Sequence, residues 1–262
     1  MNHLPALGPG KKNSFSLDTC GKGVRLETSL DSQKGEEKFT DHFGRNAPLI
    51  LGGVAMKRLP LRCELLEDRC QPAGIVTASL VGATLTLTGD DLANQINVFL
   101  NGDTVNIVGK ELTVIVGGTN FSGVSQIDVQ LAGRNDEVEF VGNFDGDIQV
   151  QDTWGKDKVK LKGNYGGAVT VDLGVGGDRF EAERGTFLGT IQVDLGSGND
   201  RVELEKATFV AAVDIDAGSG RDRLELEKVN FQVASSVDGG SEGGFVKRWK
   251  QVRGPIAILN FT

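Results

Sequence analysis

Apolar and polar residues alternate in short runs from Ile127 to about residue 234, and the whole pattern recurs every 21–22 residues. Such alternation places successive side chains on opposite faces of a β-strand. The recurrence divides this segment into five coils, each with two alternating runs and a short third segment that carries an aromatic residue. The coils are 127–147, 148–168, 169–190, 191–212 and 213–234. Self-similarity at a fixed period is typical of a repeat architecture.

One coil cannot bury its apolar side chains alone, whereas stacked coils bury a continuous core. The sequence therefore predicts an all-β fold, a right-handed parallel β-helix in which successive coils pair strand to strand about 4.8 Å apart. In coil four the inward side chains are Ile191, Val193, Leu195, Val202 and Leu204. The aromatic residues form one column: Phe144, Tyr165, Phe187, Phe209 and Phe231.

Stacking also predicts columns of charge on the outer face of the second strand, a face that we expect to be solvated. These columns are Arg179, Arg201 and Arg223; Glu181, Glu203 and Glu225; and Glu183, Glu205 and Glu227. Coil two carries lysines there instead, so that Lys160 lies between Glu139 and Glu181. Repulsion along a column and attraction between columns should nearly cancel at an exposed surface.

The flanking regions differ from the repeats. Residues 1–55 are polar and aperiodic and are expected to be disordered. Residues 75–126 contain strand-like runs separated by glycine turns, which indicates hairpins or irregular coils that cap the stack. Residues 235–262 contain GGSEGG and the basic run FVKRWKQVR, which we interpret as a degenerate cap over the open strand edges.

Between the leader and the β region, residues 56–74 form a short cassette containing LRCELLEDRCQPA. It resembles the N-terminal motif R-L-x-L-E-x-L-E-D-R-x-x-P-A of predicted exported planctomycete proteins, with departures at Pro60 and Cys63. The resemblance implies export, and it implies Met56 as the initiator, which would make residues 1–55 an over-extended gene start. A short amphipathic helix with Leu61 and Leu65 on one side is compatible with it.

The net charge and the cysteine positions argue against two classes of function, nucleic-acid binding and zinc binding. The net charge of −8 disfavours nucleic-acid binding, which needs a basic patch. Cys20, Cys63 and Cys70 all precede the repeats and lack the spacing of a zinc site. No run approaches the ~18 apolar residues of a membrane helix. We expect a secreted or cell-surface protein without a membrane span.

Each coil has a loop whose last residue, the tenth of the coil, is an aspartate: Asp136, Asp157, Asp178, Asp200 and Asp222. In coils four and five these loops read GSGND and GSGRD, and coil three has GVGGD. They resemble the G-G-x-G-x-D-x-U-x loops of repeats-in-toxin proteins, which implies calcium held between stacked loops. The residues that match are Asp178, Gly196, Gly198, Asp200, Gly218, Gly220 and Asp222.

Electrostatics favours the same ion, because carboxylates one strand spacing apart repel by ~1 kcal/mol even in water. A second aspartate column follows the first strand: Asp172, Asp194, Asp216 and Asp238. Aspartate at a turn also accepts hydrogen bonds from nearby backbone amides without a metal, so that alternative stays open. Coils one and two (AGRND, TWGKD) have lost most of the glycines, and we expect calcium at coils three to five instead.

No common enzyme motif is present, and the only histidines, His3 and His42, lie in the leader. A uniform repeat face is also a poor active site, so we expect no enzymatic activity. The sequence indicates a structural or adhesive solenoid whose partners are calcium and cell-surface polysaccharides or proteins. The alternative is a carbohydrate-binding or polysaccharide-cleaving β-helix, for which Trp154, Trp249 and Lys160 are candidate residues.

Overall fold

The computed structural model describes residues 13–17, 24–28, 50–51, 54–55 and 74–261, and divides the chain into two units, Met1–Gln71 and Pro72–Thr262. In the first unit β1 (Asn13–Leu17) pairs with β2 (Val24–Thr28) and β3 (Ile50–Leu51) with β4 (Val54–Ala55), both antiparallel. The 56–73 motif, the cysteines, the histidines and the rest of the predicted leader lie outside the described residues.

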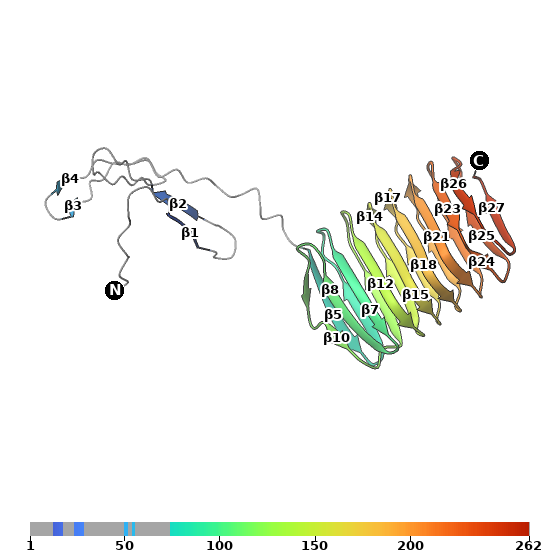
Figure 1. Cartoon of the computed structure of the whole chain (residues 1–262), viewed down its shortest axis with the longest axis horizontal. Helices are drawn as coiled ribbons and strands as arrows, with labels where there is room; N and C mark the ends of the chain where they lie inside the picture. The colour runs from blue at the N-terminus through green and yellow to red at the C-terminus, as the bar shows by residue number, and fades with distance from the viewer. Residues whose placement is uncertain (1–12, 18–23, 29–49, 52–53, 56–73, 262) are drawn as a thin grey trace. The chain divides into compact units, whose positions relative to one another are not determined.

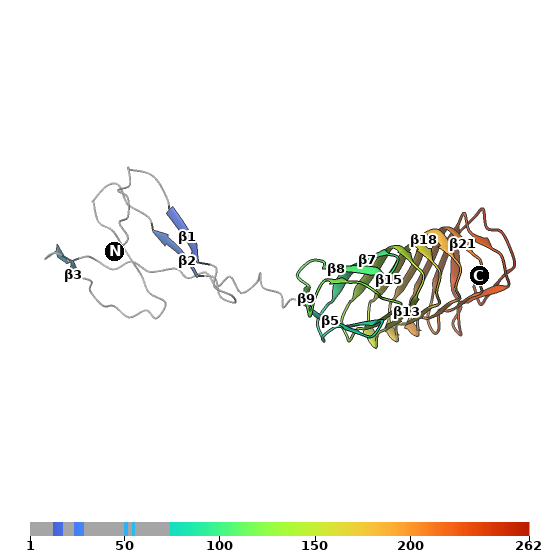
Figure 2. The same ribbon diagram turned by 90° about the horizontal axis from the view of Figure 1, so that it is seen from below.

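The second unit is a stack of coils with two long sheets (Figures 1 and 2). The first strand of each coil enters one ten-stranded sheet, called here the first-strand sheet. Its order is β9 (Val114–Val116), β5 (Ile75–Val81), β6 (Thr84–Thr88), β11 (Gln126–Gln130), β13 (Asp147–Gln151), β16 (Val169–Asp172), β19 (Ile191–Asp194), β22 (Val213–Asp216), β25 (Ser235–Asp238) and β27 (Ile256–Leu259).

The second strands form the other ten-stranded sheet, the second-strand sheet. Its order is β10 (Asn120–Phe121), β8 (Thr104–Gly109), β7 (Gln95–Asn101), β12 (Glu137–Phe144), β15 (Lys158–Tyr165), β18 (Arg179–Phe187), β21 (Arg201–Phe209), β23 (Arg223–Glu227) and β26 (Phe245–Lys250), with β24 (Asn230–Phe231) also paired to β21. A three-stranded loop sheet joins β14 (Trp154–Gly155), β17 (Val175–Gly176) and β20 (Ser197–Gly198).

Successive coils pair in parallel and in the predicted register. Ile191 lies opposite Val213 in the first-strand sheet, and Val202 lies opposite Leu224 in the second. Antiparallel pairing within this unit is confined to the hairpins near its N-terminal end, β5–β6, β7–β8 and β8–β10. The prediction of an all-β parallel solenoid is confirmed, and the 75–126 region supplies the hairpins that precede the regular coils.

The predicted inward positions form the core. The five apolar side chains assigned to the interior of coil four are each at most 2% exposed. Four of the five predicted aromatic residues form a stacked column, since the rings of Tyr165, Phe187, Phe209 and Phe231 have centroids 5.3, 4.9 and 5.2 Å apart. Phe144 lies opposite Tyr165 in register and is buried as well. Aliphatic and aromatic columns together bury one uninterrupted core along the stack.

The arrangement of the third segment differs from the prediction. In coils one to four the aromatic residue ends the second strand, and the short third strand of coils two to four belongs to the glycine loop. The strand bends toward the aromatic at a bulge in coils three to five, where Arg184, Lys206 and Lys228 adopt φ values of 52–57°. This added residue explains why coils one and two have 21 residues and the next three have 22.

The segment after coil five continues both sheets. β25 and β27 extend the first-strand sheet, and β26 pairs in parallel with β23 through a register shift after Leu224. The GGSEGG loop lies between β25 and β26, where a coil loop is expected. Residues 235–259 therefore add further rungs to the stack, and β26 and β27 are the terminal strands of the two sheets.

Candidate functional site: a buried aspartate ladder

The five loop aspartates form a buried column, each at most 2% exposed. The Oδ1 atom of each accepts a hydrogen bond from the backbone N–H of the aspartate one coil earlier, and Asn94 N–H begins the series. The five N···O distances are 2.7, 2.8, 2.7, 2.6 and 2.8 Å. The aspartates are thus rungs between coils, because each carboxylate satisfies a buried amide of its neighbour.

The second carboxylate oxygens of this aspartate ladder have no hydrogen-bond partner. All five Oδ2 atoms are buried and unpartnered. Burial raises the pKa of Asp136 to about 8, of Asp157 to about 7, of Asp178 to about 6 and of Asp200 to about 7, outweighing the backbone hydrogen bonds that lower it. Burial raises the pKa of Asp222 too. The single backbone hydrogen bond therefore compensates the charge of each ladder carboxylate only in part.

The loop glycines permit the coils to approach one another. A Cβ added to Gly198 would lie 1.2 Å from the carbonyl oxygen of Gly176, and one added to Gly220 would lie 1.4 Å from that of Gly198. Gly196 and Gly218 have φ values of 81° and 79°, which L side chains rarely adopt. The stacked backbone therefore requires glycine at these four positions, whether or not an ion binds.

The second aspartate column makes local turns. Asp194 Oδ1 accepts a hydrogen bond from Gly196 N–H at 2.9 Å, and Asp216 and Asp238 repeat this contact two residues ahead at 2.8 and 2.9 Å. Asp172, Asp194 and Asp216 are exposed. The local turn role that the sequence left open is present in the second column, whereas the first column accepts amide N–H groups of the preceding coil without a metal.

The structure stacks the predicted calcium residues of coils three to five in adjacent loops, and calcium there stays a prediction. Within residues 74–261, the one group of three acidic side chains close enough to share an ion lies elsewhere, at Asp136, Asp152 and Asp157. One carboxylate oxygen of each lies within 4.8 Å of the other two. This acidic triad belongs to the loops of coils one and two, where calcium was not expected.

Sequence reasoning missed Asp152, although the aligned coils contain the signal. The fifth residue of each coil is Leu131, Asp152, Leu173, Leu195 or Ala217, and all five are buried. The acid directly precedes the glycine-poor loop TWGKD, at the position where the adjacent coils have a core leucine.

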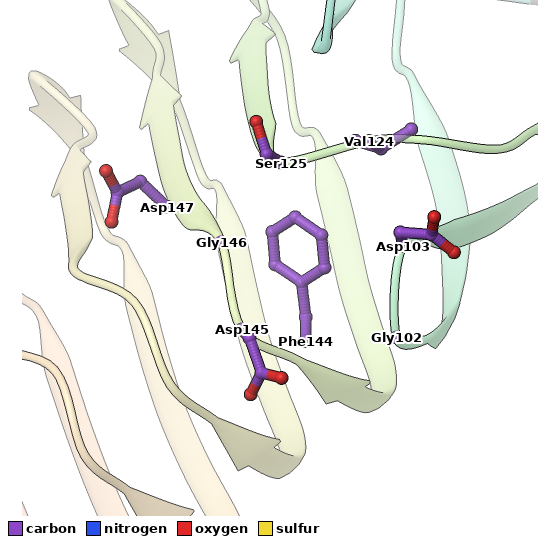
Figure 3. A pocket seen from close by; sticks show the side chains of 8 residues that line it. All are labelled: Gly102, Asp103, Val124, Ser125, Phe144, Asp145, Gly146 and Asp147. Carbon is purple, nitrogen blue, oxygen red and sulfur yellow. The ribbon is translucent and has the colours of Figure 1, made fainter.

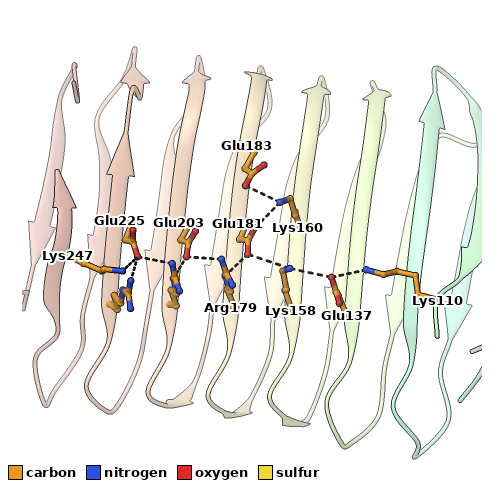
Figure 4. A network of polar contacts seen from close by, with 12 residues as sticks. Lys110, Glu137, Lys158, Lys160, Arg179, Glu181, Glu183, Glu203, Glu225 and Lys247 are labelled. Atoms are coloured by element: carbon orange, nitrogen blue, oxygen red, sulfur yellow. Dashed lines mark hydrogen bonds and ion pairs between the residues drawn. The ribbon is translucent and has the colours of Figure 1, made fainter. Parts of the chain in front are cut away.

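A network of ion pairs runs along the outer face of the second-strand sheet, from Lys110 to Lys247 (Figure 4). The predicted columns are confirmed by register. Some ion pairs are diagonal between coils, as where Arg179 Nη2 contacts Glu203 Oε1 at 2.9 Å, and others join residues of one strand, as Arg223 and Glu225 do. The expectation of a solvated face is wrong for Glu181 and Glu225, which are 2% and 7% exposed. Long side chains from neighbouring coils cover them.

Lys160 has the register predicted for it, between Glu139 and Glu181. Its Nζ contacts Glu181 Oε2 and Glu183 Oε1, both at 3.0 Å. These ion pairs raise its pKa above the ordinary lysine value, although burial opposes the shift. A lysine held as a cation by two carboxylates is a structural ion-pair partner.

A surface depression of about 430 Å³ lies beside the first aromatic of the column (Figure 3). Phe144 is only 1% exposed, so its ring is covered and cannot stack on a ligand. Asp147 Oδ1 at the rim already accepts the Ala168 N–H at 2.8 Å. The lining residues are Gly102, Asp103, Val124, Ser125, Phe144, Asp145, Gly146 and Asp147.

In the part of the chain that the structure describes, no helix is long and apolar enough to cross a membrane. Comparison of the sequence with known protein families and curated proteins, and of the fold with solved structures, finds no match.

Proposed function

We propose that this protein is an exported structural or adhesive β-solenoid of the cell surface whose loops are stabilised by calcium at coils three to five. The observation that carries the proposal is the row of buried Oδ2 atoms without a hydrogen-bond partner. A buried carboxylate is stable only when a proton, a cation or hydrogen bonds compensate its charge. A divalent ion supplies that compensation at neutral pH, and calcium prefers such oxygen ligands.

The remaining parts of the proposal rest on the shape of the repeat and on the N-terminal motif. The motif at 56–74 resembles that of exported proteins, and an acidic surface favours solubility outside the cell. On the charged face, columns of arginine and glutamate repeat from coil to coil along coils three to five. Such a uniform face suits a scaffold or an adhesive surface better than catalysis.

Asp200→Asn tests the calcium part, because asparagine keeps an acceptor for the Asp178 N–H and removes the charge. Calcium should raise the melting temperature of the wild-type protein by several degrees, and the variant should lose most of that gain. Asp214→Asn, which removes an exposed charge outside both aspartate columns, is the matched control and should respond as wild type does. If wild type and Asp200→Asn have equal melting temperatures at all calcium concentrations, the ladder aspartates serve only as hydrogen-bond acceptors.

A carbohydrate-binding role is the second candidate, favoured by two exposed tryptophans. Trp154 is 56% exposed with its ring over Gly133, and Trp249 is 51% exposed. Exposed indole rings are apolar platforms that sugars can stack on. Retention on an acidic or neutral polysaccharide column that is lost in Trp154→Ala and Trp249→Ala would favour this candidate, whereas unchanged retention would exclude both rings.

A further inference from the structure

Asp152 occupies a position that belongs to the hydrophobic core in the other coils. Its backbone N–H donates to Asp172 O at 2.8 Å, as the Leu173 N–H donates to Asp194 O at 3.1 Å, so the two residues are structurally equivalent. Asp152 is 6% exposed, and its counterparts in the neighbouring coils, Leu131 and Leu173, are 6% and 0% exposed. A side chain that ought to be aliphatic is here a buried acid.

A buried acid at this position has no protein cation to pair with. Within residues 74–261, none of the ion pairs includes Asp136, Asp152 or Asp157. Replacement of a core leucine by an uncompensated charge is strongly unfavourable, so the three neighbouring carboxylates require positive charge from elsewhere.

The Oδ2 atoms of the acidic triad are the carboxylate oxygens that an ion could bind. The Oδ1 atoms of Asp136, Asp152 and Asp157 accept the N–H groups of Asn94, Thr153 and Asp136 at 2.7, 2.6 and 2.8 Å. Their Oδ2 atoms have no donor within hydrogen-bond geometry, and all three residues are at least nine-tenths buried. The carboxyl groups of Asp136 and Asp152 lie close enough to share a proton, and the pKa of each is raised by burial. The cluster thus presents three unpartnered carboxylate oxygens on residues whose orientation is already fixed.

We propose that Asp136, Asp152 and Asp157 form a discrete binding site for one divalent cation of the calcium type, held between the loops of coils one and two. Three hard oxygen donors and no nitrogen or sulfur favour calcium, magnesium or manganese over zinc or copper. Opposite ligands of calcium are about 4.6–5.2 Å apart, which accommodates oxygens within 4.8 Å of one another. Magnesium gives up its water reluctantly, so this buried cluster favours calcium.

This site is separate from the calcium proposed at coils three to five and shares with it only the class of ion. It needs no glycine-rich loop, since Asp152 supplies one ligand from a core position directly after strand β13. Either proposal can fail while the other stands, because Asp200→Asn changes only the later loops and Asp152→Leu only the triad.

Asp152→Leu is the decisive variant, because leucine is the residue of the coils before and after. The full-length protein, freed of metal by chelation, is titrated with terbium, a luminescent substitute for calcium, while tryptophan is excited. Trp154 is two residues from Asp152, within about 7 Å along the chain, which is close enough to sensitise a bound ion. Calcium and magnesium are then added as competitors, and calorimetry with calcium measures binding independently of luminescence.

The wild-type protein should show saturable terbium luminescence that calcium displaces at lower concentration than magnesium. Asp152→Leu and the isosteric Asp152→Asn should weaken calcium binding at this site at least tenfold, while Asp172→Asn and Asp200→Asn retain it. Without metal, Asp152→Leu should melt at a higher temperature than wild type. Calcium binding by Asp152→Leu and Asp152→Asn equal to that of wild type would overturn the proposal. So would a wild-type protein that binds neither ion up to millimolar concentration, which would mean that a shared proton neutralises the triad.

Discussion

Val202 and Glu203 are adjacent in β21, yet their side chains have opposite environments. Val202 is fully buried in the stacked core, whereas Glu203 is partly exposed and pairs with Arg179 and Arg201. The alternation of single residues thus decides which side chains support the fold and which tune its surface.

We expect Val202→Asp to destabilise the protein by about 3–5 kcal/mol, because it buries a charge with no partner. Glu203→Gln should cost at most about 1 kcal/mol, because it weakens ion pairs that solvent already screens. Urea unfolding followed by circular dichroism measures both values. Similar losses in the two variants would contradict the inside–outside assignment.

Single residues also mark the limit of prediction from sequence. The period-two alternation identified the buried side chains of coil four because burial follows directly from strand geometry. It could not reveal that Glu181 is covered, since that depends on the long side chains of adjacent coils. Nor did it identify Asp152, because the alternation alone does not show that an acid in an inward column lies beside Asp136 and Asp157 once the coils are stacked.

In the glycine loops, the steric requirement of stacking produces a sequence pattern similar to that of a calcium-binding loop. Gly198 faces the carbonyl of Gly176 so closely that no side chain fits, whereas a Cβ on Gly177 would meet nothing nearer than 3.5 Å. The two glycines lie in equivalent loops of adjacent coils, but only one of them is required by the stacking distance. A family-like glycine pattern is therefore weak evidence for calcium by itself.

Gly198→Ala should destabilise the protein severely in the absence of calcium, by more than about 3 kcal/mol, because a Cβ would force the two coils apart. Gly177→Ala should change stability by less than about 1 kcal/mol. Thermal and urea unfolding in chelator measure both. If Gly198→Ala unfolds normally in chelator and loses only calcium binding, the glycine serves the ion and not the stacking.

At the same scale, the strands were predictable and their junctions were not. The two alternating runs of each coil appear in the predicted register, since a one-residue slip would expose the whole core. The short loop sheet and the bulge at Arg184, Lys206 and Lys228 carry no alternation signal. They arise from backbone pairing between coils, which becomes visible only once the coils are stacked.

Over the whole molecule, an outer set of charged columns and an inner aspartate ladder run along the stack, and their charges are compensated differently. The outer columns of lysine, arginine and glutamate neutralise one another through ion pairs between coils (Figure 4). The inner aspartate ladder has only backbone N–H partners, on one oxygen of each carboxylate. We infer that protons or divalent cations supply the positive charge that the inner column lacks.

Stability measured against pH, with and without calcium, tests that claim most directly. Burial holds the pKa values of Asp136, Asp157, Asp178 and Asp200 at about 8, 7, 6 and 7, above the ordinary value of 3.8. Between pH 4 and pH 8 the folded protein therefore retains protons that the unfolded chain has lost, and its stability should fall as pH rises. Each group contributes up to about 1.4 kcal/mol per pH unit within its window.

The measurement is the free energy of unfolding in chelator at pH 5 and pH 8, repeated with calcium, on a variant whose two histidines are glutamine, since histidine ordinarily titrates in this window. We predict lower stability at pH 8 than at pH 5 in chelator, and a calcium-dependent gain that is larger at pH 8. Stability in chelator that is constant or rises from pH 5 to pH 8 would contradict the account, because it would show that the ladder carboxylates are stable as anions without a cation.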